Sequence, residues 1–149
     1  MKKIFLLISI IFIYSCGYSP LYLSGKQDVL INLKKIEGDF ELNSYIKNDL
    51  KIASNNNSLN VFDIKADTKY EKIILTKDAT GEATDFRLDF NIKFIIISEK
   101  KEVSFKESFK IKKNDNNFEQ SNYEREIKKN FSHIVKDKLI LYLLELNDS

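Results

Sequence analysis

The chain has 149 residues and a single cysteine, and its 24 Lys and Arg residues against 22 Asp and Glu residues give a formal net charge of +2 at pH 7. One cysteine excludes a disulfide within the chain, so the fold depends on its hydrophobic core. The near balance of charges argues against a nucleic-acid-binding protein, which needs an excess of Lys and Arg on one element.

The first residues have the pattern of an export signal. Lys2 and Lys3 precede an apolar run over residues 4–14, and Ser15 follows this run. A bilayer-spanning helix needs about 20 apolar residues, so the run predicts a secretory signal peptide over residues 1–15. Its removal leaves 149 − 15 = 134 residues, the size of one domain, and lowers the formal net charge from +2 to 0.

The lone cysteine directly follows this segment. Ile13-Tyr14-Ser15-Cys16 resembles the lipobox of bacterial lipoproteins. The resemblance implies that the Cys16 thiol receives a diacylglyceryl group and that cleavage leaves Cys16 as an acylated N-terminus. Cys16 is followed by Gly17 and not by the Asp that marks retention at the inner membrane. The resemblance therefore implies a place at the outer membrane, facing the periplasm. An ordinary exported protein with an incidental thiol and an uncleaved anchor are the alternatives.

A tether, a strand and a helix are predicted next. Residues 16–26 are expected to be extended, because Pro20 fixes its own φ and disfavours a helical residue before it. Residues 29–36 alternate apolar and polar side chains and predict a strand, which Gly38 breaks. Asp39 can cap the following helix. The apolar residues of that helix recur at helical spacing: Leu42, Tyr45, Ile46, Leu50 and Ala53.

Three further strands follow the Asn-rich loop at residues 54–60. Period-two alternation predicts them over residues 62–76, 83–97 and 102–113. The second is the clearest, with Phe86, Leu88, Phe90, Ile92, Phe94 and Ile96 on one face. In the third, Glu107 interrupts the apolar face and indicates an edge of the sheet.

The last element is predicted to be a long amphipathic helix. Ser121 and Glu124 have the spacing of a capping box and predict its start. Its apolar stripe is expected to contain Tyr123, Ile127, Phe131, Ile134, Val135, Leu139, Tyr142, Leu143 and Leu146.

The predicted order is therefore strand, helix, three strands, helix. Two amphipathic helices are about enough to cover one face of a four-stranded sheet. We expect an α+β fold over residues 27–149, a two-layer sandwich with both helices on one face of the sheet. Clean alternation indicates that the other face is exposed to water, so we expect it to be left uncovered and to carry charges of both signs.

Residues that could carry catalysis are sparse. His133, the only histidine, is predicted on the solvent side of the last helix, with no nucleophile beside it. Asp63, Asp67 and Glu71 alternate with lysines on one strand face, which charge alternation explains better than acid–base catalysis. The sequence has no metal-ligand spacing. We expect no catalytic residue, no metal and no enzyme; a periplasmic hydrolase that uses His133 is the enzymatic alternative.

The polar side of the strand at 83–97 is the candidate contact surface. Its side chains are those of Asp85, Arg87, Asp89, Asn91 and Lys93. Either these charges only keep the face soluble, or they contact a partner. The second interpretation depends on Arg87, one of two arginines in a Lys-rich chain, because a guanidinium binds phosphate or carboxylate with two parallel hydrogen bonds.

Several segments resemble one family. Cys16-Gly17-Tyr18-Ser19-Pro20-Leu21-Tyr22 resembles the C-G-F-x-P-L-Y start of many members of the LPS-assembly lipoprotein LptE family. The predicted order of elements is also that of the family. LNSYIKNDL at 42–50 is similar to its first helix, ATDFRL at 83–88 to the Thr/Ala-x-x-Arg entry of its central strand, and residues 121–146 to its terminal helix.

The resemblance implies an outer-membrane lipoprotein that sits inside the LptD β-barrel, assists its assembly and takes part in inserting lipopolysaccharide into the outer leaflet. The expected partners are an LptD-type barrel, lipopolysaccharide and the membrane that holds the lipid. Candidate contacts to barrel or lipopolysaccharide are Arg87, Lys93, Asp85 and Asp89. No cofactor is expected apart from the covalent lipid on Cys16. The alternative is an auxiliary lipoprotein of a lipid-transporting ABC system.

Overall fold

The computed structural model describes residues 28–147, so the predicted signal peptide, the predicted lipidation site at Cys16 and the predicted tether lie outside the described residues. Six elements follow one another in the order strand, helix, three strands, helix. They are β1 (Leu30–Gly38), α2 (Phe40–Ala53), β2 (Val61–Lys77), β3 (Ala83–Ile96), β4 (Lys101–Lys112) and α3 (Asn117–Asn147). The predicted order of elements is confirmed.

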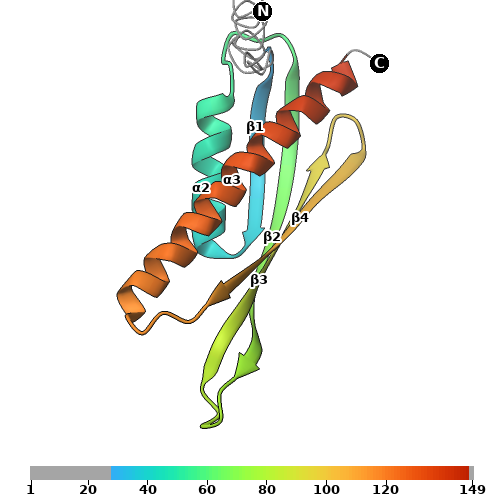
Figure 1. Cartoon of the computed structure of the whole chain (residues 1–149). Coiled ribbons are helices and arrows are strands. Elements are labelled where there is room, and N and C mark those ends of the chain that lie inside the picture. The colour runs from blue at the N-terminus through green and yellow to red at the C-terminus, as the bar shows by residue number, and fades with distance from the viewer. Residues whose placement is uncertain (1–27, 148–149) are drawn as a thin grey trace, which may run out of the picture.

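The strands form one mixed sheet in the order β1-β2-β3-β4. β1 and β2 are parallel and are connected through α2, while β2, β3 and β4 pair in antiparallel fashion. Both helices cover the same face of the sheet (Figure 1), which confirms the two-layer α+β sandwich. β4 is an edge strand, as Glu107 indicates, and Glu107 forms an ion pair with Lys138 of α3 at 3.1 Å.

The core lies between the helices and the covered face of the sheet. Alternate residues of β3 from Leu88 to Ile96 are buried, as their period-two pattern predicts. At the centre, the ring centroid of Phe90 lies 5.1 Å from that of Phe131 on α3 and 5.1 Å from that of Tyr70 on β2. Such aromatic pairs contribute about 0.5–1.5 kcal/mol beyond the area they bury, so they fix α3 against the middle of the sheet.

A glycine and an aspartate turn the chain from β1 into α2. Gly38 has a φ of +106°, and a Cβ at this position would lie 1.8 Å from the backbone oxygen of Thr68 on β2. Asp39 caps α2, and its carboxylate accepts a hydrogen bond from the backbone nitrogen of Leu42 at 2.8 Å. The predicted break at Gly38 and the predicted cap at Asp39 are both confirmed.

α3 begins earlier than the sequence predicts. The capping-box spacing of Ser121 and Glu124 predicts a start after Ser121, but the helix starts at Asn117. Asn116 provides the cap instead, because its side-chain oxygen accepts a hydrogen bond from the backbone nitrogen of Phe118 at 3.0 Å. The predicted start is wrong because an Asn side chain caps a helix as effectively as a Ser side chain does. Several asparagines precede the helix, so the sequence offered more than one possible N-cap.

The buried stripe of α3 also differs from the predicted one. Tyr123 and Ile134 are exposed, and Ile140, which the predicted stripe omits, is fully buried. The helix crosses the sheet obliquely (Figure 1), so the side that meets the sheet changes along its length. Two polar residues, Lys128 and Ser132, lie within the buried stripe because both find partners on α2.

The β2–β3 hairpin extends past the rest of the sandwich. β1 pairs with β2 only as far as Thr68, whereas β2 continues to Lys77. The hairpin therefore projects beyond β1 and both helices, at the end of the molecule opposite to residue 28 (Figure 1). Within residues 28–147, no helix has the length and apolar character needed to cross a membrane.

Candidate functional site

The uncovered side of the sheet carries the candidate contact residues, and we call it the open face. Strand pairing places its side chains in cross-strand rows. One row holds Glu71, Asp89 and Ser108, and the next holds Lys69, Asn91 and Lys106. Acidic and basic rows thus follow one another along the strands, as the sequence predicts for a wet face.

Arg87 is paired within the open face. Its Nε donates to the two carboxylate oxygens of Asp89 at 2.9 and 3.0 Å. Ser108 also donates to this carboxylate, at 2.7 Å. The Arg87 side chain is 41% exposed, so a phosphate or carboxylate of a partner can reach the guanidinium.

The other predicted contact residues also have partners on this face. Lys93 forms an ion pair with Glu102 of β4 at 2.6 Å. Asp85 accepts hydrogen bonds from Thr76 and Thr84, which lower the pKa of its carboxyl below the usual value, the Thr76 bond most strongly. The structure therefore brings all four predicted residues to one strand of one face, where each already has an intramolecular partner.

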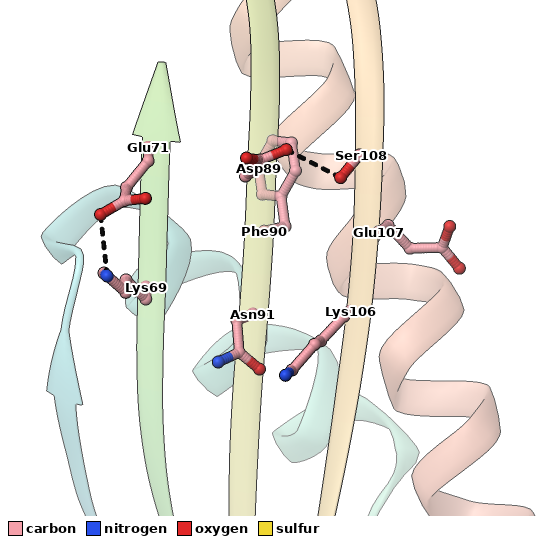
Figure 2. A pocket seen from close by; sticks show the side chains of 8 residues that line it. All are labelled: Lys69, Glu71, Asp89, Phe90, Asn91, Lys106, Glu107 and Ser108. Atoms are coloured by element: carbon pink, nitrogen blue, oxygen red, sulfur yellow. Dashed lines mark hydrogen bonds and ion pairs between the residues drawn. The ribbon is translucent and has the colours of Figure 1, made fainter. Parts of the chain in front are cut away.

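A shallow depression of about 300 Å³ lies at the centre of the open face (Figure 2). Lys69 and Glu71 form an ion pair of 2.8 Å at its rim, and the Lys106 amine points toward Asn91. The side-chain oxygen of Asn91 is buried here and has no hydrogen-bond partner among the described residues. A partner that carries charges of both signs suits the rim of this depression better than a bare anion does.

Cations gather where the open face reaches the end of β4. Arg87 lies opposite Lys110, and Asp85 lies opposite Lys112. The sequence suggests that lysines near Arg87 and Lys93 are contacts, but it does not single out these two, because single lysines carry little information in a Lys-rich chain. The register of β3 and β4 places Lys110 beside Arg87, and alternation alone does not give that register.

His133 lies on α3, away from the open face, and it has a partner that the sequence did not reveal. Its Nδ1 lies 2.9 Å from a carboxylate oxygen of Asp49 on α2. Ser132 donates to the same oxygen at 2.5 Å, and Ser132 is completely buried. The serine proton thus points to the aspartate and not to the histidine, so this trio joins α3 to α2 and lacks the hydrogen bond of a nucleophile–base pair.

A second polar cluster joins the beginnings of α2 and α3 to β2. The Lys128 ammonium lies 2.8 Å from Glu41 and 4.1 Å from the centre of the Tyr70 ring. Its hydrogen bond lowers the pKa of the Glu41 carboxyl, and burial, followed by the charge of Glu124, raises the pKa of Tyr70. Lys128 is buried in this way because a charge is tolerated inside when it is paired.

Neither cluster has the composition of a metal centre. Over residues 28–147, no group of three or more His, Cys, Asp and Glu side chains could hold a metal ion. The predicted contact residues lie on the open face and not in these two clusters.

Comparisons with known proteins identify the fold. No protein-family model and no curated protein sequence matches the chain. Rare lipoprotein B from Shewanella oneidensis is similar in structure, with a TM-score of 0.54 and 12% identity over 80% of this chain and 96% of that chain. A minor lipoprotein from Acinetobacter baumannii has a TM-score of 0.50 and 11% identity over 78% and 94%. The chain has the fold of these bacterial lipoproteins.

Proposed function

We propose that the chain is a non-enzymatic lipoprotein on the periplasmic face of the outer membrane. It fits inside an LptD-type β-barrel, helps that barrel to assemble and takes part in inserting lipopolysaccharide into the outer leaflet. Support comes from the fold shared with bacterial lipoproteins, the lipobox-like residues that end at Cys16, and the start at Cys16 to Tyr22 that resembles the LptE family.

The open face is the main structural support for the proposal. The lumen of an outer-membrane barrel is polar, so a protein inside it needs an outer surface with hydrogen-bond donors and acceptors. The open face supplies both along β3, and neither α2 nor α3 covers it (Figure 1).

Lipopolysaccharide would meet the cationic end of this face. Its phosphates and acidic sugars are anions, which charge-assisted hydrogen bonds from Arg and Lys bind well. Arg87 and Lys110 lie opposite each other there, and the Arg87 side chain is 41% exposed. The ion pair with Asp89 uses the Nε of Arg87 and orients its side chain.

The non-enzymatic part of the proposal follows from the chemistry around His133. A hydrolase would need a nucleophile activated by the imidazole. The neighbouring hydroxyl, that of Ser132, is buried and bonded to Asp49. Replacement of His133 is therefore expected to affect the contact between α2 and α3 and not a reaction.

Co-purification tests the proposal. Extraction of the protein from membranes in mild detergent, followed by mass spectrometry, should recover a large β-barrel protein in a constant ratio. Arg87→Glu should lower this recovery about fivefold, the effect of roughly 1 kcal/mol. Lys129→Glu, an equal charge change at an exposed position on α3, should leave it unchanged.

Two results would contradict the proposal. The protein could be recovered as a lone monomer under these mild conditions, in which case it has no stable barrel partner. Recovery of an inner-membrane transport complex would instead support the auxiliary lipoprotein of a lipid-transporting ABC system.

A further inference from the structure

β4 leaves one edge of the sheet unpaired over its whole length. It is the last strand in the order β1-β2-β3-β4 (Figure 1), and among the described residues only β3 pairs with it. Its register with β3 runs without interruption from Lys101 to Lys112. An exposed edge of this kind is a template for a further strand, so proteins usually shorten it, bend it or cover it.

The other free edges of the sheet are irregular. The pairing of β1 with β2 shifts its register between Leu33 and Lys35, and the part of β2 beyond Thr68 shifts its register with β3 between Ile74 and Lys77. Such irregularities bend a strand and hinder the addition of another. β4, which is described in full, has no such shift, and it contains no proline. The sheet thus keeps one long and regular edge.

The register also identifies the backbone groups that point outward from β4. The Lys113 N–H donates to the Thr84 backbone oxygen at 2.7 Å, and these two residues continue the register of β3 and β4. Opposite residues of antiparallel strands alternate between pairs that exchange backbone hydrogen bonds and pairs that do not. The odd-numbered residues of β4 therefore bond to β3, and the even-numbered residues direct their N–H and C=O groups away from the sheet. These are Glu102, Ser104, Lys106, Ser108, Lys110 and Lys112.

The side of β4 that belongs to the open face is cationic. Lys106, Lys110 and Lys112 are exposed there. Glu102 is the one acidic residue that β4 presents to this side, and it already forms an ion pair with Lys93 at 2.6 Å. A strand beside β4 would place its own side chains next to the lysines, because opposite residues of paired strands lie on the same face. Acidic side chains at alternate positions would complement this row.

The other side of β4 is apolar and incompletely covered. The ring centroid of Phe105 lies 6.2 Å from that of Phe94, and the ring centroid of Phe109 lies 5.7 Å from that of Phe90. Both phenylalanines of β4, together with Val103, remain partly exposed. Apolar side chains of an added strand would bury the exposed parts of these residues, which favours pairing.

We propose that β4 accepts an additional strand from the barrel protein, and that apolar residues alternate with Asp or Glu in this strand. Its carboxylates lie beside the lysines, and a polar residue lies at the level of Glu107, which is paired with Lys138. The wall strands of a closed barrel have no free edge, so the segment is a loop or chain end that enters the lumen. The identity of the partner rests on the proposed function, whereas the strand addition rests on β4.

Hydrogen exchange at single backbone amides tests the strand addition. The acylated full-length protein is extracted in mild detergent, and the fractions with and without the barrel protein are compared by mass spectrometry with electron-transfer fragmentation. In the free protein, the amides of Ser104, Lys106, Ser108 and Lys110 should exchange fast and those of their odd-numbered neighbours slowly. In the complex, these four outward amides should slow by about 100-fold, and the odd-numbered ones should stay slow.

A proline at one outward position provides a second test. Ser104→Pro removes an outward N–H and leaves the hydrogen bonds between β4 and β3 in place, since an edge strand tolerates proline where its N–H faces away from the sheet. Loss of this hydrogen bond should lower the recovery of the barrel protein about fivefold. Ser104→Ala removes the same hydroxyl but keeps the N–H, so its recovery should equal that of the wild type. Equal recovery from both variants would contradict the added strand. Urea unfolding checks that Ser104→Pro is folded, and the exchange measurement on the wild type decides if it is not.

The outcomes separate this inference from the proposed function. A complex with the barrel protein in which the four outward amides exchange as fast as in the free protein overturns the strand addition and leaves the barrel partner intact. Slow exchange of these amides already in the free protein, as a monomer or as a dimer, shows that the chain itself covers the edge, and it overturns the inference as well. If no barrel protein is recovered, the proposed partner is wrong, and the inference fails with it.

Discussion

We expect Cys16→Ser to abolish the incorporation of labelled palmitate into the protein. The thiolate is the nucleophile that forms the thioether to diacylglycerol, and a serine hydroxyl is far less nucleophilic at neutral pH. Each buried methylene contributes about 0.8 kcal/mol to membrane attachment, and two or more chains make the attachment stable. The same substitution should leave residues 1–15 uncut, because cleavage follows acylation in this class of protein.

The matched control is Ser19→Ala, which changes the same segment and keeps the thiol. Its labelling and its processed mass should equal those of the wild type. Labelling of Cys16→Ser at the level of the wild type would show that the lipid is attached elsewhere or that the label is not covalent, and it would contradict the proposed anchor.

Gly38→Ala is expected to destabilise the fold by about 4 kcal/mol, the sum of backbone strain and overlap with a neighbour. The φ of Gly38 is +106°, which L side chains rarely adopt. An added Cβ would also lie 1.8 Å from Thr68 O, in the strand that pairs with β1. Because this atom belongs to the backbone, relief of the overlap requires β1 and β2 to separate. A domain of this size is stable by roughly 5–15 kcal/mol, so the loss is large.

Gly81→Ala separates the two causes. Gly81 also has a positive φ, of +87°, but a Cβ there meets nothing within 4 Å. Its substitution should therefore cost only about 1–2 kcal/mol, the strain of a left-handed residue. Urea unfolding followed by circular dichroism measures both variants. Similar losses for Gly38→Ala and Gly81→Ala would mean that the close approach to β2 is not as the structure has it.

Local patterns predicted most of the fold. The alternation in β3 gave its buried face residue by residue, and Gly38 and Asp39 each have a local chemical role that sequence reveals. The predicted start of α3 was wrong because Asn116 and Ser121 are both good caps, and only the packing of the whole helix decides which of them is used. The overhang of the β2–β3 hairpin depends on where β1 stops pairing, which no local pattern contains.

The candidate site was predictable as a face but not as a set of contacts. Alternation placed Asp85, Arg87, Asp89 and Lys93 together, and the structure agrees. The pairing of Arg87 with Asp89 and the position of Lys110 depend on rotamers and on the register of β4. Buried polar residues were missed for a different reason. Lys128 and Ser132 interrupt the apolar stripe of α3, and only their partners on α2 explain why they are inside.

The proposed anchor and the open face define one proposed arrangement. In it, lipid on Cys16 holds the sandwich at the membrane, and the open face meets the wall of the barrel. The proposed function depends on one part of this arrangement, the contact between the open face and the barrel wall.

Photocrosslinking from the open face in living cells tests this contact most directly. A photoreactive amino acid is placed at position 87 or at position 93, and the adducts are identified by mass spectrometry. We expect adducts with an LptD-type barrel protein from both positions and with lipopolysaccharide from position 87. Adducts with inner-membrane transport proteins alone, or the absence of any adduct with an envelope component at both positions, would contradict the proposed function.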